Sequence, residues 1–466
     1  VDEYPVERVA EITWVPAKDI AQAARMYAKA KPAAIHWGVP IDMTPAITPT
    51  TQGIAALWCL TGNLDRPGGN VISRYAFDAV AYALPGAEGI IKLKSAEADE
   101  KRIGRDRYGP LRQFIWRAHT DLVLDQIFSE DPYPIKAMWI QTCNPRAGIG
   151  LDPLKWREAL KKLDFVTVVD LFMTPTAQYA DVVLPATTFL EKESVRSWWV
   201  PLQSINKAIE VEECRSDLEI NFELAKRFDP DFRWDTIHDL FDDIVRPAGM
   251  TFEELQEKGW AFPPEGHPSH PYHRYQKGLL RPDGQPGFQT PSGKMELHSI
   301  LRENWGSEPL PDYEEPPFTP VSQPELLKEY PLILSTGRRS AVFFHAEHRN
   351  IPWLRELDPD PLVEIHPDTA KSLDIGGGEW VWIENWMGRC RFRAKVTLEV
   401  PPWMVMATHG WWFPEEPAEE PSLYGVWKSN INQLIPMGYQ GEDGLGAPIK
   451  HMLCKVYKVG EGGEAR

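Results

Sequence analysis

The chain has 466 residues, of which 43% are hydrophobic and 25% are charged, and its formal net charge is -17. This length suffices for about two to four domains with large cores. The acidic balance argues against nucleic acid and anionic membrane surfaces as general partners, and no apolar run reaches the length of a membrane span. A negatively charged ligand would therefore need a local group of basic residues.

The cysteines are scattered along the chain, and no CxxC pair occurs. This spacing excludes a local iron–sulfur or zinc-thiolate motif. The odd number and wide spacing predict buried free thiols and no disulfide framework. The five are Cys59, Cys143, Cys214, Cys390 and Cys454. The chain starts at Val1 and shows no signal-peptide pattern, so we expect a fragment or a processed form.

The first 75 residues alternate between helical and extended patterns. We predict helices over 6–12 and 18–30, a strand over 33–39 and an apolar helix over 51–60. Gly and Pro then punctuate a turn, Thr61–Gly69. Residues 76–132 have no clear period and are interpreted as an insertion or covering segment with one helix near Leu111–His119.

Two apolar runs form the most informative part of the sequence. Ala137–Ile140 is followed by Asn144-Pro145, and Phe165–Val169 is followed directly by Asp170. Between them, Asp152-Pro153 is typical of a helix N-cap followed by Pro at the first helical position. The pattern predicts strand, helix and strand.

A third apolar run, 181–185, completes a parallel sheet with right-handed crossovers. Ligands bind beyond the carboxyl ends of such strands, where Asn144 and Asp170 would lie side by side. A carboxylate there can accept hydrogen bonds from the N–H edge of a guanine or from ribose hydroxyls. The segment therefore predicts a site for a nucleotide-bearing cofactor.

The remaining chain divides into two regions of different composition. After a predicted helix over 218–227, residues 228–330 are rich in Pro, Gly and charge, which is typical of a surface excursion or an interdomain connection. From Pro331 the sequence turns to short apolar strands, which favour a compact barrel. These strands are predicted at 332–335, 362–365, 379–384, 390–397 and 403–408.

Several short motifs could carry chemistry, and each has a structural alternative. The run Ser335–Ser340 (STGRRS) combines a Gly with arginines suited to phosphate, but it is equally a turn with two exposed arginines. His345 and His348 lack a third ligand for zinc, although His345 alone is able to donate to a cofactor heteroatom.

Three further motifs favour a structural role or stay open. Gly376–Gly378 is interpreted as a turn entering a strand, and the aromatics of His409–Phe413 as core residues. Asn430 and Asn432 could be ordinary turn residues. No Ser/His/Asp triad, Walker A loop or HExxH motif occurs, so no residue is assigned as catalytic and none as a metal ligand.

The order of the motifs along the chain is more specific than any one of them. It runs TGN-L-x-x-PGG (Thr61–Gly69), NP (144–145), D-x-F-M-T-P-T-A-x-x-A-D-V-V-L-P (Asp170–Pro185) with Glu191 beyond, T-P-S-G-K-x-E-L (Thr290–Leu297) and T-G-R (336–338) followed by His345. This series resembles the molybdopterin oxidoreductase family, the dimethyl sulfoxide reductase superfamily. The likeness is nearest to the acetylene hydratase and thiosulfate/polysulfide reductase branches.

The resemblance implies an α/β fold with parallel-sheet dinucleotide-binding domains followed by a C-terminal double-psi β-barrel. It divides the chain into the end of one α/β domain (1–75), a covering segment (76–132), the second half of a dinucleotide-binding domain (133–230), a Pro-rich linker (231–330) and the barrel domain (331–466). The implied cofactor is bis(molybdopterin guanine dinucleotide) with Mo or W. A [4Fe–4S] cluster is expected only in the missing N-terminal region.

The resemblance also assigns residues to the cofactor. Asn144 and Asp170 should contact one guanosine, with Thr174 on the same loop, and Gly38 and Asp42 should approach the other dinucleotide. The residues expected at pyrophosphate or pterin atoms are Thr336, Gly337, Arg338, His345 and Asn432.

The implied function is oxygen-atom or electron transfer on a small substrate. The metal ligand of the family would lie upstream of this sequence. A non-redox hydratase or hydroxyl-transferring enzyme and a non-catalytic subunit that retains the fold are the alternatives. We expect a small-molecule substrate and an iron–sulfur electron-transfer subunit as partners, with no nucleic acid and no direct membrane span. The protein would be cytoplasmic, or exported folded if an upstream twin-arginine signal exists.

Overall fold

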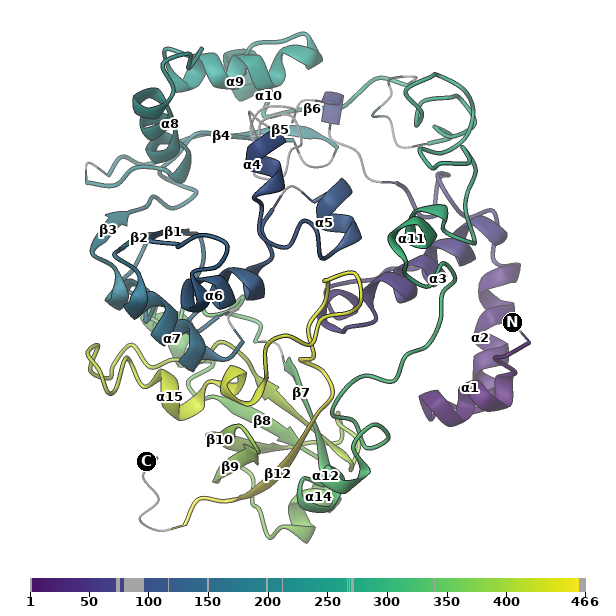
Figure 1. Cartoon of the computed structure of the whole chain (residues 1–466), viewed down its shortest axis with the longest axis vertical. Coiled ribbons are helices and arrows are strands. Elements are labelled where there is room, and N and C mark those ends of the chain that lie inside the picture. The colour runs from purple at the N-terminus through teal and green to yellow at the C-terminus, as the bar shows by residue number, and fades with distance from the viewer. Residues whose placement is uncertain are drawn as a thin grey trace.

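Three separate sheets organise the computed structural model of the chain (Figure 1). A parallel sheet lies beside a closed barrel, and a small antiparallel sheet with helices lies at the end of the molecule farthest from the barrel. The structure describes residues 2–72, 76–78, 96–115, 117–148, 151–197, 200–211, 213–265, 267, 269, 272–338 and 340–460. The predicted combination of a parallel α/β sheet and a C-terminal barrel is confirmed.

The parallel sheet contains β1 (Ala137–Gln141), β2 (Phe165–Asp170) and β3 (Val182–Pro185) in that order. Helix α7 (Pro153–Lys162) connects β1 to β2, and the predicted cap is present because Asp152 Oδ1 accepts a hydrogen bond from Lys155 N at 3.1 Å. The short turn η3 (Ala177–Tyr179) connects β2 to β3. Register pairs Ala137 with Phe165 and Asp170 with Pro185, so β1 and β2 end at the same edge.

The barrel closes through six strands in the order β10-β8-β11-β7-β12-β9. Alternate residues of each strand point inward, and the core includes Leu334, Ile383 and Phe392. Cys390 and Cys454 are buried in the same core as free thiols, as predicted, while the other three cysteines are half-buried. The strands are β7 (Leu332–Arg338), β8 (Leu362–Ile365), β9 (Trp380–Asn385), β10 (Gly388–Val396), β11 (Met404–Thr408) and β12 (Met452–Lys458).

A third core lies around the antiparallel sheet of β4 (Ser194–Arg196), β5 (Leu202–Ile205) and β6 (Trp260–Ala261). Its helices are α8 (Asp217–Phe228), α9 (Ile237–Val245) and α10 (Phe252–Lys258). Each begins at a capping box, in which a Ser or Thr and the Glu or Asp three residues later satisfy each other's backbone N–H. The predicted 231–330 linker therefore contains more regular structure than its composition indicates, because α9, α10 and β6 pack against β5 and α8.

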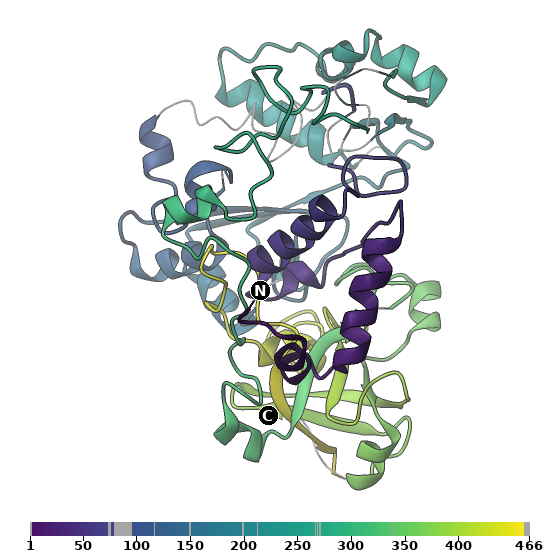
Figure 2. The same cartoon turned by 90° about the vertical axis from the view of Figure 1, so that its right-hand side faces the viewer.

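Helices α1 (Val6–Thr13), α2 (Ala17–Lys29) and α3 (Ile47–Leu60) confirm the N-terminal helix predictions, and α1 and α2 lie beside the barrel (Figure 2). The predicted strand over 33–39 is wrong. Side-chain amides take the place of a neighbouring strand: Ala33 N donates to Asn63 Oδ1 at 3.1 Å, and Ile35 N donates to Asn70 Oδ1 at 2.8 Å.

The predicted helix near 111–119 is present only in part. Helix α5 (Gly109–Gln113) ends early, and α6 (Thr120–Ser129) begins after a break. Helix α6 packs against α7 through a shared core that includes Leu124 and Trp156. The other short helices are α4 (Ala96–Glu100), α11 (Ile300–Trp305), α12 (Pro324–Glu329), α13 (Pro352–Leu357), α14 (Pro367–Ser372) and α15 (Val426–Ser429).

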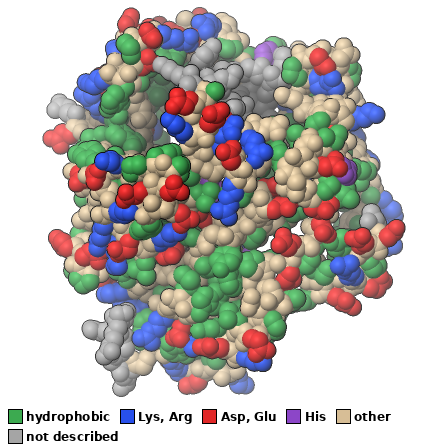
Figure 3. Space-filling view, viewed as in Figure 1, with side chains coloured by type: hydrophobic (Ala, Val, Ile, Leu, Met, Phe, Trp, Pro, Cys, Tyr) green, Lys and Arg blue, Asp and Glu red, His purple; other side chains and the backbone are tan. Residues whose placement is uncertain are grey.

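Acidic and basic side chains are interspersed over the face shown in Figure 3, and hydrophobic side chains gather over the barrel. No helix among the described residues has the length and hydropathy needed to cross a bilayer.

A buried ion pair fixes the Thr61–Gly69 turn to the distant 272–288 segment. Asp65 is 0% exposed and Arg274 is 1% exposed, and Arg274 Nη2 lies 3.1 Å from Asp65 Oδ1. Asp65 Oδ2 also accepts a hydrogen bond from Arg274 N at 2.5 Å. Because both charges are removed from water, each depends on the other.

We predict that Arg274→Met lowers the free energy of unfolding by about 3–5 kcal/mol, because Asp65 is left buried without a partner. Asp65→Asn combined with Arg274→Met should recover part of this loss. Urea unfolding measures both. Arg227→Met is the control, since the Arg227–Glu223 pair is exposed and should contribute less than about 1 kcal/mol. Equal losses in both single variants would contradict a special role for the buried pair.

Candidate functional site

The predicted residues after β1 and β2 lie together at the carboxyl edge of the parallel sheet. Asn144 Oδ1 accepts a hydrogen bond from Thr176 Oγ1 at 2.6 Å, and Arg146 N donates to the same hydroxyl at 3.1 Å. Thr174 Oγ1 accepts from Ala177 N at 3.3 Å. The two bonds of Thr176 join the 144–148 loop, which follows β1, to the 170–177 loop, which follows β2, and the Thr174 bond lies within the second loop.

Asp170 is the last residue of β2 and is half-buried. Its Oδ1 accepts a hydrogen bond from Phe172 N at 3.3 Å. Burial raises the pKa of Asp170, and the charges of Glu347 and Asp217 raise it further. Removal from water is the largest cause, so the carboxylate is less well solvated than one on the surface.

Cys143 shares this environment. Burial raises the pKa of its thiol to about 11, and the charges of Asp170 and Glu347 act in the same direction. The sheet edge is therefore acidic and suits a ligand that presents N–H donors. It is poorly suited to a phosphate.

Two buried asparagines hold the 144–148 loop from the barrel side. Asn430 Nδ2 donates to Arg146 O at 3.1 Å, and Asn432 Nδ2 donates to Gly148 O at 2.7 Å. Asn430 Oδ1 also accepts from Asn432 N at 3.1 Å. A Cβ at Gly148 would lie 3.3 Å from the Cβ of Ala346, so the loop is seated closely on the barrel side. We call Asn430 and Asn432 the asparagine clamp.

His345 is hydrogen-bonded to a second histidine. Its Nδ1 lies 2.8 Å from Nε2 of His409, which follows β11. The backbone N–H of His345 donates to Glu347 Oε2 at 2.6 Å. Glu347 therefore lies next to the imidazole pair, and its charge also reaches Asp170.

A buried arginine holds the backbone of this histidine pair. Arg349 is 1% exposed, and its Nη2 donates to His345 O at 2.9 Å and to His409 O at 3.1 Å. Its guanidinium lies over the rings of Phe343 and Trp411. Burial lowers its pKa to about 9. Trp411 and Trp412 are buried, which confirms that the aromatics of the 409–413 motif belong to the core.

The T-G-R motif ends strand β7, and its arginine is paired with Asp358 and Thr408. Arg338 Nη1 donates to Thr408 Oγ1 at 3.0 Å and lies 3.3 Å from Asp358 Oδ2. Its Nε is 3.8 Å from Glu364 Oε1. The alternative of an exposed arginine in a turn is wrong for Arg338, since its side chain is 12% exposed and faces two carboxylates. Its contact with the cofactor stays a prediction.

Thr336 and Gly337 have different surroundings. Thr336 Oγ1 donates to Ile449 O at 3.1 Å and lies 3.5 Å from Lys450 Nζ. A Cβ at Gly337 would meet Met406 Sδ at 3.0 Å, so a larger residue there would require the Met406 side chain to shift. Lys450 is a basic residue beside Thr336 that the sequence analysis did not predict as part of the site.

Gly38 and Asp42 lie in the segment that precedes α3, which is separate in sequence from the sheet-edge loops and from the T-G-R motif. Asp42 lies in the short helix η1 (Ile41–Met43) before α3. The next residues, Thr44 and Pro45, have backbone atoms against Gly446 and Gly441. The 441–446 turn in turn precedes Ile449 and Lys450, which contact Thr336.

The structure thus groups Asn144, Asp170, Thr174, His345 and Asn432 around the 144–148 loop. Sequence reasoning missed Cys143, Thr176, Glu347 and Arg349. The NP and T-P-T patterns were the sequence signals that indicated this site. The histidine pair could not be predicted from local sequence, because its two residues are 64 positions apart. No group of three or more His, Cys, Asp or Glu side chains is arranged to hold a metal ion in the described ranges.

Comparisons with known proteins agree with this geometry. Residues 21–227 match the family described as molybdopterin oxidoreductase, and residues 332–442 match the molydopterin dinucleotide binding domain. The acetylene hydratase of Syntrophotalea acetylenica is 32% identical over 98% of this chain and 65% of its own length. The dopamine dehydroxylase of Eggerthella lenta is 30% identical over 98% of this chain and 52% of its own length.

A solved structure gives the same result. The acetylene hydratase from Pelobacter acetylenicus superposes with a TM-score of 0.87 at 28% identity, covering 98% of this chain and 65% of that one. This chain therefore spans about half to two thirds of the length of these relatives. The two family matches, the sequence relatives and the superposition together place this chain in the molybdopterin oxidoreductase family.

Proposed function

We propose that this chain holds a guanosine end of the family's Mo- or W-containing molybdopterin guanine dinucleotide at the edge formed by Asn144 and Asp170. The observation that carries this proposal is the half-buried carboxylate of Asp170 at the carboxyl end of β2, beside the loop that follows β1. A ligand that presents N–H donors offsets the cost of holding this charge out of water. The guanine edge, which has adjacent N–H donors, meets that requirement.

The surrounding residues have distinct tasks in this proposal. Asp170 accepts hydrogen bonds from guanine. Asn144, whose Oδ1 is engaged by Thr176, donates through its amide. Thr174 and the asparagine clamp shape the two loops, since their side chains bond to backbone atoms.

The phosphate and pterin contacts are assigned to the barrel side. Thr336 and Lys450 supply a hydroxyl and a positive charge, and Gly337 allows close approach. Arg338 reaches the pyrophosphate in this proposal, and its bonds to Asp358 and Thr408 orient the guanidinium. His345, held by His409, faces the pterin, and Gly38 and Asp42 approach the second dinucleotide.

The reaction is proposed for the longer protein of which this chain represents the cofactor-binding part. When bound, the metal supplies oxygen-atom or electron-transfer chemistry on a small substrate, with an iron–sulfur subunit as electron partner. A non-redox hydratase is the second candidate, favoured by the 32% identity and the superposition with acetylene hydratases. Turnover of the full-length protein without an electron acceptor would favour the hydratase, and a strict requirement for an acceptor would favour redox chemistry.

Asp170→Asn in the full-length protein should lower the guanine nucleotide content about tenfold or more, because a charge-assisted acceptor becomes an amide that presents a donor. Nucleotide released by acid and quantified by chromatography measures this content. Asp164→Asn is the matched control, since that carboxylate is 70% exposed and is paired only distantly with Lys136. Unchanged content in Asp170→Asn would remove Asp170 from the site.

The same substitution should raise the stability of the cofactor-free chain at pH 7. The folded state raises the pKa of Asp170, so ionisation favours the unfolded chain, and the wild type loses stability as the pH rises from about 3.9 through the folded-state pKa. Asp170→Asn avoids this loss, and the difference should vanish below about pH 3. Urea unfolding at both pH values tests the prediction, which fails if the variant is the less stable at pH 7.

Asn432→Ala should reduce both stability and cofactor retention, because Gly148 O loses its buried donor. We expect a cost of about 1–3 kcal/mol and faster hydrogen exchange in the 144–148 loop. Gln433→Ala is the control, since Gln433 Nε2 bonds only within its own segment, to Trp427 O and Asn430 O. Equal loss of cofactor in the two variants would contradict a specific role for the clamp.

A further inference from the structure

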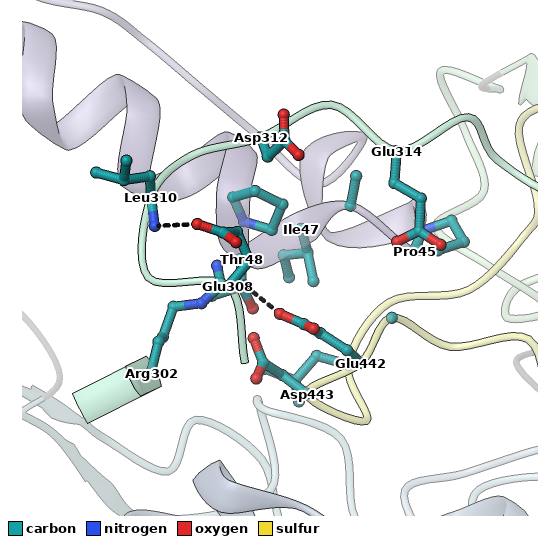
Figure 4. Close-up of a pocket in the computed structure, with 14 residues that line it drawn as sticks. Pro45, Ile47, Thr48, Arg302, Glu308, Leu310, Asp312, Glu314, Glu442 and Asp443 are labelled. Atoms are coloured by element: carbon teal, nitrogen blue, oxygen red, sulfur yellow. Dashed lines mark hydrogen bonds and ion pairs between the residues drawn. The ribbon is translucent and has the colours of Figure 1, made fainter. Parts of the chain in front are cut away.

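A cavity of about 90 Å³ lies between the start of α3, the 302–314 segment and the 441–445 turn (Figure 4). Five acidic side chains line it beside apolar groups, with Arg302 as the basic lining residue. None of the ten residues predicted to contact the cofactor lines it. The acidic lining residues are Glu308, Asp312, Glu314, Glu442 and Asp443.

Asp443 lies in this wall and is only 3% exposed. Its Oδ1 accepts a hydrogen bond from Ser307 Oγ at 3.2 Å, but its Oδ2 is buried and has no hydrogen-bond partner among the described residues. A buried carboxylate without a cation is costly. An external donor at this oxygen would relieve the cost.

Arg302 does not fill this role. Its Nη2 is paired with Glu442 Oε1, and its Nη1 donates to Gln52 Oε1 at 3.4 Å. The described part of the chain contains no Lys or Arg within ion-pair distance of Asp443. Figure 4 shows the Asp443 carboxylate directed into the cavity beside the Arg302–Glu442 pair.

The rest of the lining indicates the class of cation. Pro45, Ile47, Leu310 and Leu445 line the cavity together with the acids. A metal ion gains nothing from these apolar groups, and no set of three acidic, His or Cys side chains converges here among the described residues. An alkylammonium has a charged head with N–H donors and an apolar stem, and so matches both parts of the wall.

We propose that this cavity binds a primary alkylammonium group, with its N–H donors on Asp443 and its methylene stem against Ile47 and Leu310. The exposed acids Glu308, Glu314 and Glu442 attract the cation to the mouth. A free amine and a lysine side chain share this chemistry. Occupancy would connect three segments that are distant in sequence.

Isothermal titration calorimetry of the full chain with n-butylammonium tests the proposal. We expect saturable binding to the wild type, no binding of 1-butanol, and affinity that falls with ionic strength. Asp443→Asn should weaken binding about tenfold or more, since it removes a buried charge-assisted acceptor. Glu314→Gln, at the exposed mouth, should weaken it about two- to fivefold. The control Glu356→Gln, at an exposed position on α13, should bind as the wild type.

The result that overturns the proposal is absence of binding to the wild type, tighter binding of Mg²⁺ than of the amine, or unchanged affinity in Asp443→Asn. If Asp443→Asn fails to fold, Glu314→Gln tests the proposal in its place. Unchanged affinity of Glu314→Gln for butylammonium, together with an affinity that does not depend on ionic strength, would then overturn the proposal. Titration with Nα-acetyl-lysine amide and with Nα,Nε-diacetyl-lysine amide identifies the source, because only the former carries a primary ammonium. Binding of the former more tightly than butylammonium points to a protein lysine, and the reverse order points to a free amine.

Discussion

The candidate site depends on the asparagine clamp, through which the barrel side holds the 144–148 loop of the parallel sheet. Asn430 and Asn432 are 284 positions away from the carbonyl groups that they bind. Both asparagines and residues 145–148 of the loop are buried, so loss of the clamp would leave these carbonyl groups without a hydrogen-bond partner. The relative position of the two cores, and with it the distance between the sheet edge and the histidine pair, is set at this joint.

Buried arginines stabilise the same joint in a protein that is acidic overall. Arg146 lies in the loop itself, with its guanidinium over Trp427 and Tyr179, and burial lowers its pKa to about 10. Arg349 donates to the backbone of both histidines. These guanidiniums bond to backbone oxygens and pack on aromatic rings, so they shape the site without supplying a surface charge.

The sequence predicted the parts of this arrangement that follow from local pattern. Alternating and continuous apolar runs located β1, β2 and five of the six barrel strands, and Asp152-Pro153 located the start of α7. The last barrel strand, β12 (Met452–Lys458), was not predicted. Parallel pairing then placed Asn144 and Asp170 at one edge. The 33–39 segment was misassigned because its extended backbone is paired with the side chains of Asn63 and Asn70, which no periodicity reveals.

Contacts between segments that are distant in the chain could not be predicted from local sequence patterns. The His345–His409 bond, the asparagine clamp and the pairing of Arg338 with Asp358 each depend on how the barrel closes. The T-G-R motif belongs to the end of β7 and not to a turn, and its arginine is paired with Asp358 and Thr408, which lie 20 and 70 residues away. Burial of Asp170, which gives the proposed guanine contact its energetic basis, likewise comes from packing that the motif alone does not encode.

The central claim is that these two cores form part of a holder for a molybdopterin guanine dinucleotide. Metal analysis combined with nucleotide analysis of the purified full-length protein tests it most directly. The account predicts molybdenum or tungsten together with guanine nucleotide, in the ratio that a bis(dinucleotide) cofactor requires. Native, folded protein that contains neither the metal nor the nucleotide would contradict it.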